Sequence, residues 1–395
     1  MHTRVLEPRQ ITILTTSKCT AACRHCCMNS SPERSDTLTW EQLEKILSQA
    51  FTDLRLKLVI FAGGEPMLLG NTLYKALRMV KSHGLATRMV TNAYWASSRE
   101  HAQLKLRELE QAGLDELNIS SDDYHLDFIK LDAVRNAYEL ALTMNFSAVV
   151  LANCFGPESH LTPERIRREF GTADMKLRFD DDGATIENHK QKGKTLVVLS
   201  NSPVQSLARG CTEMKPSELP AALTDSELDR IGDLVGGCPW AIRSAAISAK
   251  GHFVACCGFE VEDNPILDYG SLDTHPLAEL VDKADNDLVT NMIAILGPIK
   301  VMRLLQRICP DEISFPRGYR SYCEVCFDLV SLKQNRDALY RHMDEFVEVI
   351  LAARNLVKQT YLDKGVREYP PLRITADLSA SPGPSKTTPI ADWRG

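Results

Sequence analysis

The sequence has no apolar run approaching the eighteen residues of a membrane-spanning helix, and its start, MHTRVLEPRQ, lacks the apolar stretch of a secretory signal. It has no excess of basic charge either: the formal net charge is -6 at pH 7, so neither nucleic acid nor an anionic membrane is indicated as a partner. No Ser-His-Asp or paired-carboxylate constellation stands out, and no internal repeat is present. These absences predict a cytoplasmic globular protein.

Cysteine, by contrast, is abundant, with 12 among 395 residues. In a reducing compartment, this many cysteines indicate metal binding or catalysis rather than a disulfide framework. They form two groups, with Cys154 alone between them: Cys19, Cys23, Cys26 and Cys27, and then Cys211, Cys238, Cys256, Cys257, Cys309, Cys323 and Cys326. The grouping predicts two metal sites.

Short apolar runs alternate with helical patterns through the first half of the chain. Runs such as LVIFA are apolar without alternation, as in strands that are covered on both faces of a parallel sheet. Amphipathic helices lie between them, and in TWEQLEKILSQAF the residues Thr39 and Gln42 have the spacing of a capping box. The pattern predicts an α/β fold that forms an open or partial barrel. The expected strands are 11–14, 56–62, 86–91, 115–120, 147–152 and 195–200.

The organisation changes near residue 205, which predicts a barrel domain over 1–205 and a smaller cysteine-bearing module over 206–330. Within that module, SAAISAKGHFVACC is expected to form two short strands around a turn, and HPLAELVDKA a helix. A long helical pattern follows over 331–360. The polar tail 361–395, rich in Pro and Ser, is expected to be mobile.

The segment SKCTAACRHCCMN spaces three cysteines as C-x3-C-x2-C: Cys19, Cys23 and Cys26. A structural zinc site uses four ligands in a closed tetrahedron, so three cysteines leave one position open. A cluster of four irons takes four thiolates, so three leave one iron free to bind something else. Zinc held by these three cysteines with His25 or Cys27 is the alternative.

A second motif, Gly63-Gly64-Glu65-Pro66, follows the LVIFA strand. Its glycines allow the backbone to approach a ligand closely, and Glu65 can accept hydrogen bonds from an amine. The two motifs, in this order and at the ends of these strands, resemble the radical S-adenosylmethionine (SAM) superfamily. The resemblance covers the catalytic half of the chain and implies a partial (β/α)6 barrel. It also implies a [4Fe-4S] cluster on Cys19, Cys23 and Cys26, whose fourth iron is chelated by SAM.

The resemblance further implies a set of SAM contacts. They are His25, Gly63, Gly64, Glu65, Pro66, Asn92, Ser120 and Asp122. His25 is expected either to pack against the adenine or to be a solvent-exposed loop histidine. Asn92 precedes Ala93, where the family often has glycine. For Ser120 and Asp122 the alternative is a helix cap.

The second half resembles the auxiliary-cluster modules of the same superfamily, named SPASM with two clusters and twitch with one. The resemblance rests on Cys238, Gly251 and Cys256 and on the later Cys323-Glu-Val-Cys326. No cysteine follows Cys326, so the expectation is one auxiliary [4Fe-4S] cluster on four thiolates: Cys238, Cys256, Cys323 and Cys326. A four-cysteine zinc site is the alternative. Cys257 and Cys309 are left as substitutes or bystanders.

The implied reaction is reductive cleavage of SAM to a 5'-deoxyadenosyl radical, which abstracts a hydrogen atom from the substrate. A fully ligated auxiliary cluster suits electron transfer, so we expect an oxidoreductase, and among twitch enzymes the chain looks most like the aminocyclitol dehydrogenases. The substrate is expected to be a small metabolite or a peptide side chain, and the electron donor a flavodoxin or ferredoxin. The short segment ahead of Cys19 leaves little room for a peptide-recognition domain, which disfavours the peptide.

Two other hypotheses stay open. Cys211, in SLARGC, is a candidate catalytic thiol that returns a hydrogen atom, as in radical epimerases or bond-forming peptide maturases; a buried structural cysteine is the alternative. The stretch Asp123-Tyr124-His125 is expected either to line the substrate pocket or to begin the next helix, and no role is assigned to Cys154. The third hypothesis, outside catalysis, is a zinc-stabilised binding protein. The sequences of the barrel loops do not identify the substrate.

Overall fold

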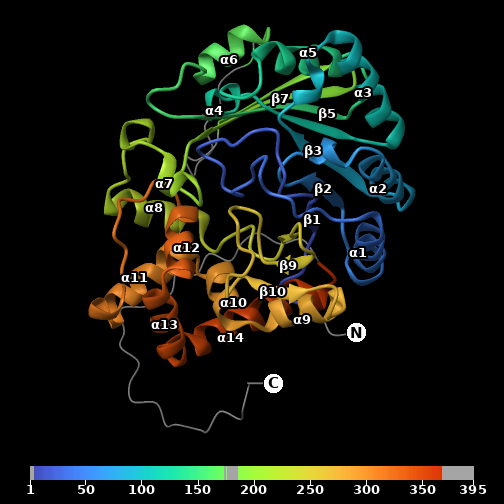
Figure 1. Ribbon diagram of the computed structural model, residues 1–395. Helices are drawn as coiled ribbons and strands as arrows, with labels where there is room; N and C mark the ends of the chain where they lie inside the picture. The colour runs from blue at the N-terminus through green and yellow to red at the C-terminus, as the bar shows by residue number, and fades with distance from the viewer. Residues whose placement is uncertain (1–3, 173–174, 176–185, 367–395) are drawn as a thin grey trace.

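The structure, a computed structural model, describes residues 4–172, 175 and 186–366 (Figure 1). The described strands form one ten-stranded sheet in the order β10-β9-β8-β1-β2-β3-β4-β5-β7-β6. The strands are β1 (Gln10–Leu14), β2 (Leu58–Ala62), β3 (Ala86–Thr91), β4 (Glu116–Ser120), β5 (Ala148–Phe155), β6 (Ile186–Lys192), β7 (Thr195–Pro203), β8 (Ser244–Ile247), β9 (His252–Val254) and β10 (Asp268–Ser271).

Helices flank this sheet and fill the second half of the chain. The α-helices are α1 (Trp40–Asp53), α2 (Asn71–Ser82), α3 (Arg99–Ala112), α4 (Asp123–Leu126), α5 (Leu131–Ala141), α6 (Pro163–Glu169), α7 (Gly210–Glu213), α8 (Asp225–Val235), α9 (Leu277–Asn286), α10 (Leu288–Ile295), α11 (Pro298–Ile308), α12 (Tyr322–Ser331), α13 (Lys333–Arg341) and α14 (Asp344–Thr360). The short 3-10 helices are η1 (Pro66–Leu69), η2 (Tyr94–Ala96), η3 (Pro216–Glu218), η4 (Pro310–Glu312) and η5 (Leu362–Lys364).

The six predicted strands of the first half are confirmed, and they pair in parallel as β1-β2-β3-β4-β5-β7. Helices α1, α2, α3 and α5 lie along one side of this sheet (Figure 1). The predicted capping box is also confirmed: Thr39 Oγ1 accepts from the Gln42 backbone N–H at 3.2 Å, and Gln42 Oε1 accepts from the Thr39 N–H at 3.0 Å. The sequence pattern therefore yields a partial parallel barrel.

The strand β6 was not predicted. It pairs with β7 as an antiparallel hairpin at one edge of the sheet. Its sequence, IENHKQK, contains a single apolar residue, so hydrophobic periodicity gives no signal for it. Backbone pairing with β7 defines this strand.

The second half joins the same sheet through β8, which pairs in parallel with β1. The expected pair of short strands is confirmed, because β8 and β9 are antiparallel neighbours around the turn at 248–251. The helix expected in HPLAELVDKA is α9. The sheet is continuous across the predicted boundary at residue 205, so the division into 1–205 and 206–330 stays a prediction.

The single helix expected over 331–360 is wrong, because α13 ends at Arg341 and α14 begins at Asp344. The break has a basic residue in the last turn before it and Asp344 and Glu345 in the first turn after it, charges that suit these two helix ends.

The tail over 361–395 was expected to be mobile, and its residues 367–395 lie outside the described residues. Within the described ranges, no single helix is long and apolar enough to cross a membrane; α10 and α11 meet that measure only as a pair bent by 112°.

Asp285, near the end of α9, joins the start of the chain to α14. Its side chain is 3% exposed. One carboxylate oxygen accepts the backbone N–H of Val5 at 3.1 Å and that of Leu6 at 2.7 Å. Arg354 of α14 forms an ion pair with the same carboxylate at 3.2 Å. This contact fixes the segment that leads into β1.

We predict that Asp285→Ala lowers the free energy of unfolding by about 3–5 kcal/mol, because it removes the carboxylate that pairs with the largely buried Arg354 guanidinium. It also leaves the N–H groups of Val5 and Leu6 without their acceptor, while Arg354 keeps its hydrogen bond to Asn291. Asp282→Ala is the matched control: Asp282 is 48% exposed, and its pair with Arg4 is expected to contribute about 1 kcal/mol or less. Urea unfolding followed by circular dichroism measures both variants. Equal losses in the two variants would contradict the assignment.

Candidate functional site

A cavity of about 650 Å³ lies where the parallel strands end. It is lined from the carboxyl ends of these strands or the loops after them, including Gly63, Asn92, Ser120, Cys154 and Ser202. Ligands of α/β sheets bind at this edge, and the volume is in the usual range for a small-molecule site. The cavity is therefore the candidate functional site.

The three cysteines of the C-x3-C-x2-C motif, Cys19, Cys23 and Cys26, all line this cavity. The loop that carries them folds on itself, because the Cys26 N–H donates to the Cys23 carbonyl at 3.0 Å. Burial raises the pKa of Cys19 to about 11, and the neighbouring Cys23 and Cys26 add to the shift. Three thiols that converge on one wall fit a [4Fe-4S] cluster with one iron left open.

Gly63 and Gly64 bring the segment after β2 into contact with this cysteine loop. The Gly64 N–H donates to the Thr16 carbonyl at 2.6 Å, and the Glu65 N–H donates to the Lys18 carbonyl at 3.0 Å. A Cβ atom on Gly64 would lie 2.0 Å from the Lys18 carbonyl oxygen, and Gly63 has a φ of +120°. Only glycine fits at either position. Both line the cavity, so their expected contact with SAM is sterically possible.

Glu65 is fully buried and joins the end of β2 to the end of β3. Its carboxylate accepts from Thr91 Oγ1 at 2.8 Å, from the Asn92 N–H at 2.9 Å and from the Met67 N–H at 3.1 Å. Burial raises its pKa to about 7, although these three hydrogen bonds oppose the rise. Glu65 and Pro66 are not among the residues that line the cavity, so Glu65 acts here as a brace between loops.

Asn92 extends this brace to the cysteine loop. Its side-chain amide donates to Thr20 Oγ1 at 3.0 Å and lies 3.5 Å from Cys19 Sγ. Ala93, which occupies the position where glycine was expected, adopts the left-handed conformation with a φ of +62°. The local turn is therefore kept without glycine, at a cost of about 1–2 kcal/mol.

His25 lies in the cavity wall and its side chain is 12% exposed, so it is not a solvent-exposed loop histidine. Its ring contacts Tyr124 with the centroids 4.7 Å apart, and burial lowers its pKa to about 4.

Asp122 caps α4 through the His125 N–H at 3.0 Å and does not line the cavity, whereas Ser120 and His125 do. The cap interpretation of Asp122 is thus confirmed.

The four predicted auxiliary ligands line the same cavity. They are Cys238, Cys256, Cys323 and Cys326. Cys238 lies after α8, Cys256 lies after β9, and the other two lie three residues apart on α12. Burial raises the pKa of Cys238, although the backbone N–H groups of Trp240 and Ala241 oppose the rise. Four convergent thiols with N–H donors to sulfur fit a fully ligated cluster.

Two cysteines that the sequence left unassigned also line the cavity: Cys27 and Cys257. Cys154, at the end of β5, lines it too. Cys257 Sγ accepts from Thr12 Oγ1 of β1 at 3.6 Å. The sequence feature that could have placed Cys27 and Cys257 at the cavity is that each directly follows a predicted ligand, Cys26 or Cys256.

Cys211, the predicted catalytic thiol, is exposed and does not line the cavity. Its Sγ lies 3.2 Å from both the Ser206 carbonyl and Arg317 Nη1.

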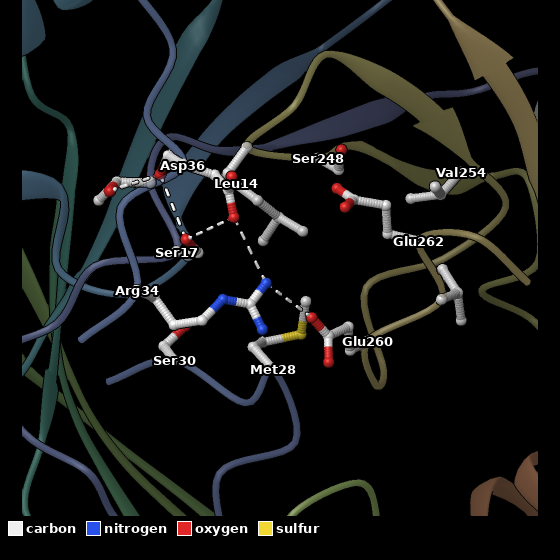
Figure 2. A pocket seen from close by; sticks show the side chains of 14 residues that line it. Leu14, Ser17, Met28, Ser30, Arg34, Asp36, Ser248, Val254, Glu260 and Glu262 are labelled. Carbon is white, nitrogen blue, oxygen red and sulfur yellow. Dashed lines mark hydrogen bonds and ion pairs between the residues drawn. The ribbon is translucent and has the colours of Figure 1, made fainter. Parts of the chain in front are cut away.

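The second half of the chain fastens the cysteine loop in place. Arg209 donates to the carbonyls of Cys23 at 3.2 Å and Ser30 at 2.9 Å. The Glu260 N–H donates to the Cys27 carbonyl at 2.7 Å. Figure 2 shows Arg34 between Asp36 and Glu260, with its guanidinium 3.1 Å from the Glu260 carboxylate. These contacts hold the two cysteine groups at one cavity.

The chain is similar to several known proteins. Residues 13–144 match the family described as the Radical SAM superfamily. Over 346 residues the chain is 25% identical to YydG of Bacillus subtilis (strain 168), which is provisionally named a peptide biosynthesis protein; the alignment covers 86% of this chain and 97% of YydG. The fold is similar to that of anSMEcpe, solved with bound AdoMet and the Cp18Cys peptide, with a TM-score of 0.50, 12% identity, and coverage of 89% of this chain and 100% of that chain.

A further structure, BtrN in complex with AdoMet and 2-DOIA, has a TM-score of 0.41 and 13% identity, and the alignment covers 72% of this chain and 87% of that chain. The family match favours an enzyme over the hypothesis of a zinc-stabilised binding protein. It also implies a [4Fe-4S] cluster and SAM, which the thiols and glycines of this cavity fit.

We predict that Gly64→Ala prevents iron from loading at Cys19, Cys23 and Cys26, because the new Cβ would overlap the Lys18 carbonyl and displace the cysteine loop. The control is Gly84→Ala, where no atom lies within 4 Å of the added Cβ; its φ of +72°, unlike the φ of Gly64, lies in the left-handed region, so this control carries backbone strain without a steric overlap. Iron per chain is measured after anaerobic loading with iron and sulfide. Full iron content in Gly64→Ala would contradict the steric argument.

Proposed function

We propose that this chain, whose residues 13–144 are a radical SAM domain, modifies a peptide by removing a hydrogen atom from one carbon and returning a hydrogen atom to it. One observation carries the proposal. Three thiols outside both predicted ligand sets line the cavity, Cys27, Cys154 and Cys257, and Cys257 is the one that directly follows a predicted auxiliary ligand, Cys256. An epimerase needs such a thiol within reach of the substrate.

The bound cofactors supply the difficult chemistry, and the chain supplies position. When bound, SAM with the cluster at Cys19, Cys23 and Cys26 supplies a 5'-deoxyadenosyl radical, and the auxiliary cluster supplies a one-electron redox partner. Arg209 and Glu260 fix the backbone of the cysteine loop, so its thiols keep their positions.

Cys257 replaces Cys211 as the proposed hydrogen donor. In the returning step, the S–H bond of Cys257 breaks and a C–H bond forms on the substrate carbon, which leaves a thiyl radical on the sulfur. One electron and one proton restore the thiol. Cys257 is adjacent to Cys256, a proposed auxiliary ligand, so a redox partner lies next to the thiyl. Hydrogen return therefore gives a role to Cys257 and also to the four predicted auxiliary ligands.

A peptide substrate is supported by the relationship to YydG, whose name refers to peptide biosynthesis. The alignment spans 97% of YydG, so the likeness is not confined to the radical SAM domain. The cavity wall includes Trp240, which is 50% exposed and donates from Nε1 to the Tyr322 hydroxyl at 2.9 Å. This half-exposed aromatic offers a surface on which a peptide can pack.

Oxidation of the substrate is the second candidate function. It is supported by the four auxiliary thiols, which all line the cavity and so fit an electron acceptor close to the substrate. In that reaction the substrate radical loses an electron and a proton, and no hydrogen atom returns. The two candidates differ in product mass and in the need for Cys257.

We predict about eight irons per chain after anaerobic loading with iron and sulfide, and 5'-deoxyadenosine on addition of SAM and a reductant. Cys326→Ala is expected to keep about four irons and to form 5'-deoxyadenosine, whereas Cys23→Ala is expected to form none. Iron analysis and liquid chromatography measure these outcomes. Unchanged iron content in Cys326→Ala would exclude it as an auxiliary ligand.

We further predict that Cys257→Ala forms 5'-deoxyadenosine but returns no hydrogen, whereas the control Cys211→Ala behaves as the wild type. Short peptides encoded beside the gene serve as substrates in D2O, and mass spectrometry measures the product. Wild type and Cys211→Ala should add one deuterium, because the thiol proton exchanges with solvent. A wild-type product lighter by two hydrogens would contradict hydrogen return and support oxidation.

A further inference from the structure

A cluster of metal-ligating side chains lies outside the cavity, where α11 and η4 meet the break between α13 and α14. It consists of Cys309, Glu312 and His342, whose ligand atoms all lie within 4.8 Å of one another. None of the three is among the residues that line the cavity. The cluster therefore forms a separate centre.

Among the described residues, the side chain of Cys309 and the Nε2 atom of His342 are buried without a hydrogen-bond partner, while the His342 side chain as a whole is 19% exposed. Cys309 is 5% exposed, and no hydrogen bond from its thiol is found among the described residues. His342 Nε2 is also buried and makes no hydrogen bond, although Glu312 Oε2 is 3.5 Å away. Buried polar atoms normally have a partner, so these two require an explanation.

A carboxylate lies near each ring nitrogen of His342. Nδ1 is 3.5 Å from Glu345 Oε1, while Nε2 points toward Glu312. A carboxylate on the far ring nitrogen orients a metal-ligating histidine and fixes its tautomer. Arg341 also contacts Glu312, which holds that carboxylate beside the histidine.

We propose that Cys309, Glu312 and His342 bind one zinc ion, with water as the fourth ligand on the side of Glu312, which is 37% exposed. Thiolate, imidazole and carboxylate together suit zinc.

The backbone supports the ligand positions without the ion. The Cys309 N–H donates to the Leu305 carbonyl of α11 at 2.8 Å, and the Glu312 N–H donates to the Cys309 carbonyl at 3.0 Å. The His342 N–H donates to the Ala338 carbonyl of α13 at 3.0 Å. A zinc ion at this point would join η4 to the junction of α13 and α14, and so connect two elements far apart in sequence.

The test uses the full chain loaded anaerobically with iron and sulfide, then incubated with zinc and desalted. Mass spectrometry of metals is expected to find about one zinc per chain with the iron unchanged. X-ray absorption at the zinc edge, which does not respond to iron, is expected to show one sulfur at about 2.3 Å and nitrogen or oxygen at about 2.0–2.1 Å. Absence of zinc, or a shell of four sulfurs, would overturn the proposal.

Three variants sharpen the result. Cys309→Ser and His342→Gln are expected to lose the zinc, and Glu345→Gln to weaken its affinity by about 10–100-fold. The matched control is His275→Gln, which alters another histidine beside a carboxylate, at 4.0 Å from Glu279, and which belongs to no cluster of metal-ligating side chains among the described residues. It should retain the zinc. Retention in both ligand variants would overturn the proposal, and if Cys309→Ser does not fold, His342→Gln and the wild-type absorption spectrum decide.

Discussion

The structure of the site depends on one steric constraint, the contact between the backbones of Gly63-Gly64 and the cysteine loop. A side chain at Gly64 would lie 2.0 Å from the Lys18 carbonyl oxygen. Because the two segments touch directly, the turn after β2 sets the position of the loop after β1. Glu65 then holds the end of β3, and Asn92 reaches back to Cys19. The loops after three neighbouring strands thus form one interlocked unit that positions the first thiols.

The pairing of β8 with β1 extends this unit to the second half of the chain. Because β1 has parallel neighbours on both sides, its direction also fixes that of β8. The segment after β9 then returns toward the cysteine loop, where Glu260 bonds to Cys27. Two cysteine groups that are about two hundred residues apart in sequence therefore line one cavity. This shared sheet explains why a single substrate could contact both.

The sequence predicted the parallel strands well, because strands covered on both faces are apolar throughout, as LVIFA is. It also identified the three-cysteine motif and the glycines, since their spacing is itself the signal. It failed for β6, whose polar sequence carries no periodicity, and for the break at 342–343, which apolar spacing alone does not show. The sequence also did not predict that Cys211 is exposed and outside the cavity. The exposure of this thiol depends on the path of its linker and on Arg317, which is distant in sequence.

The thiols that surround the cavity are positioned by the contacts of the backbone that carries them. Burial raises the pKa of Cys19 to about 11 and that of Cys256 to about 12, which favours the protonated form of both groups at neutral pH. Binding of a cluster to these thiols must therefore release protons. Backbone N–H groups beside Cys238 and Cys256 oppose the rise in pKa, so they reduce the cost of forming the thiolates that a cluster requires. Cys257 belongs to neither predicted ligand set, and this is why hydrogen return, which needs a thiol and not a bound thiolate, is proposed for it.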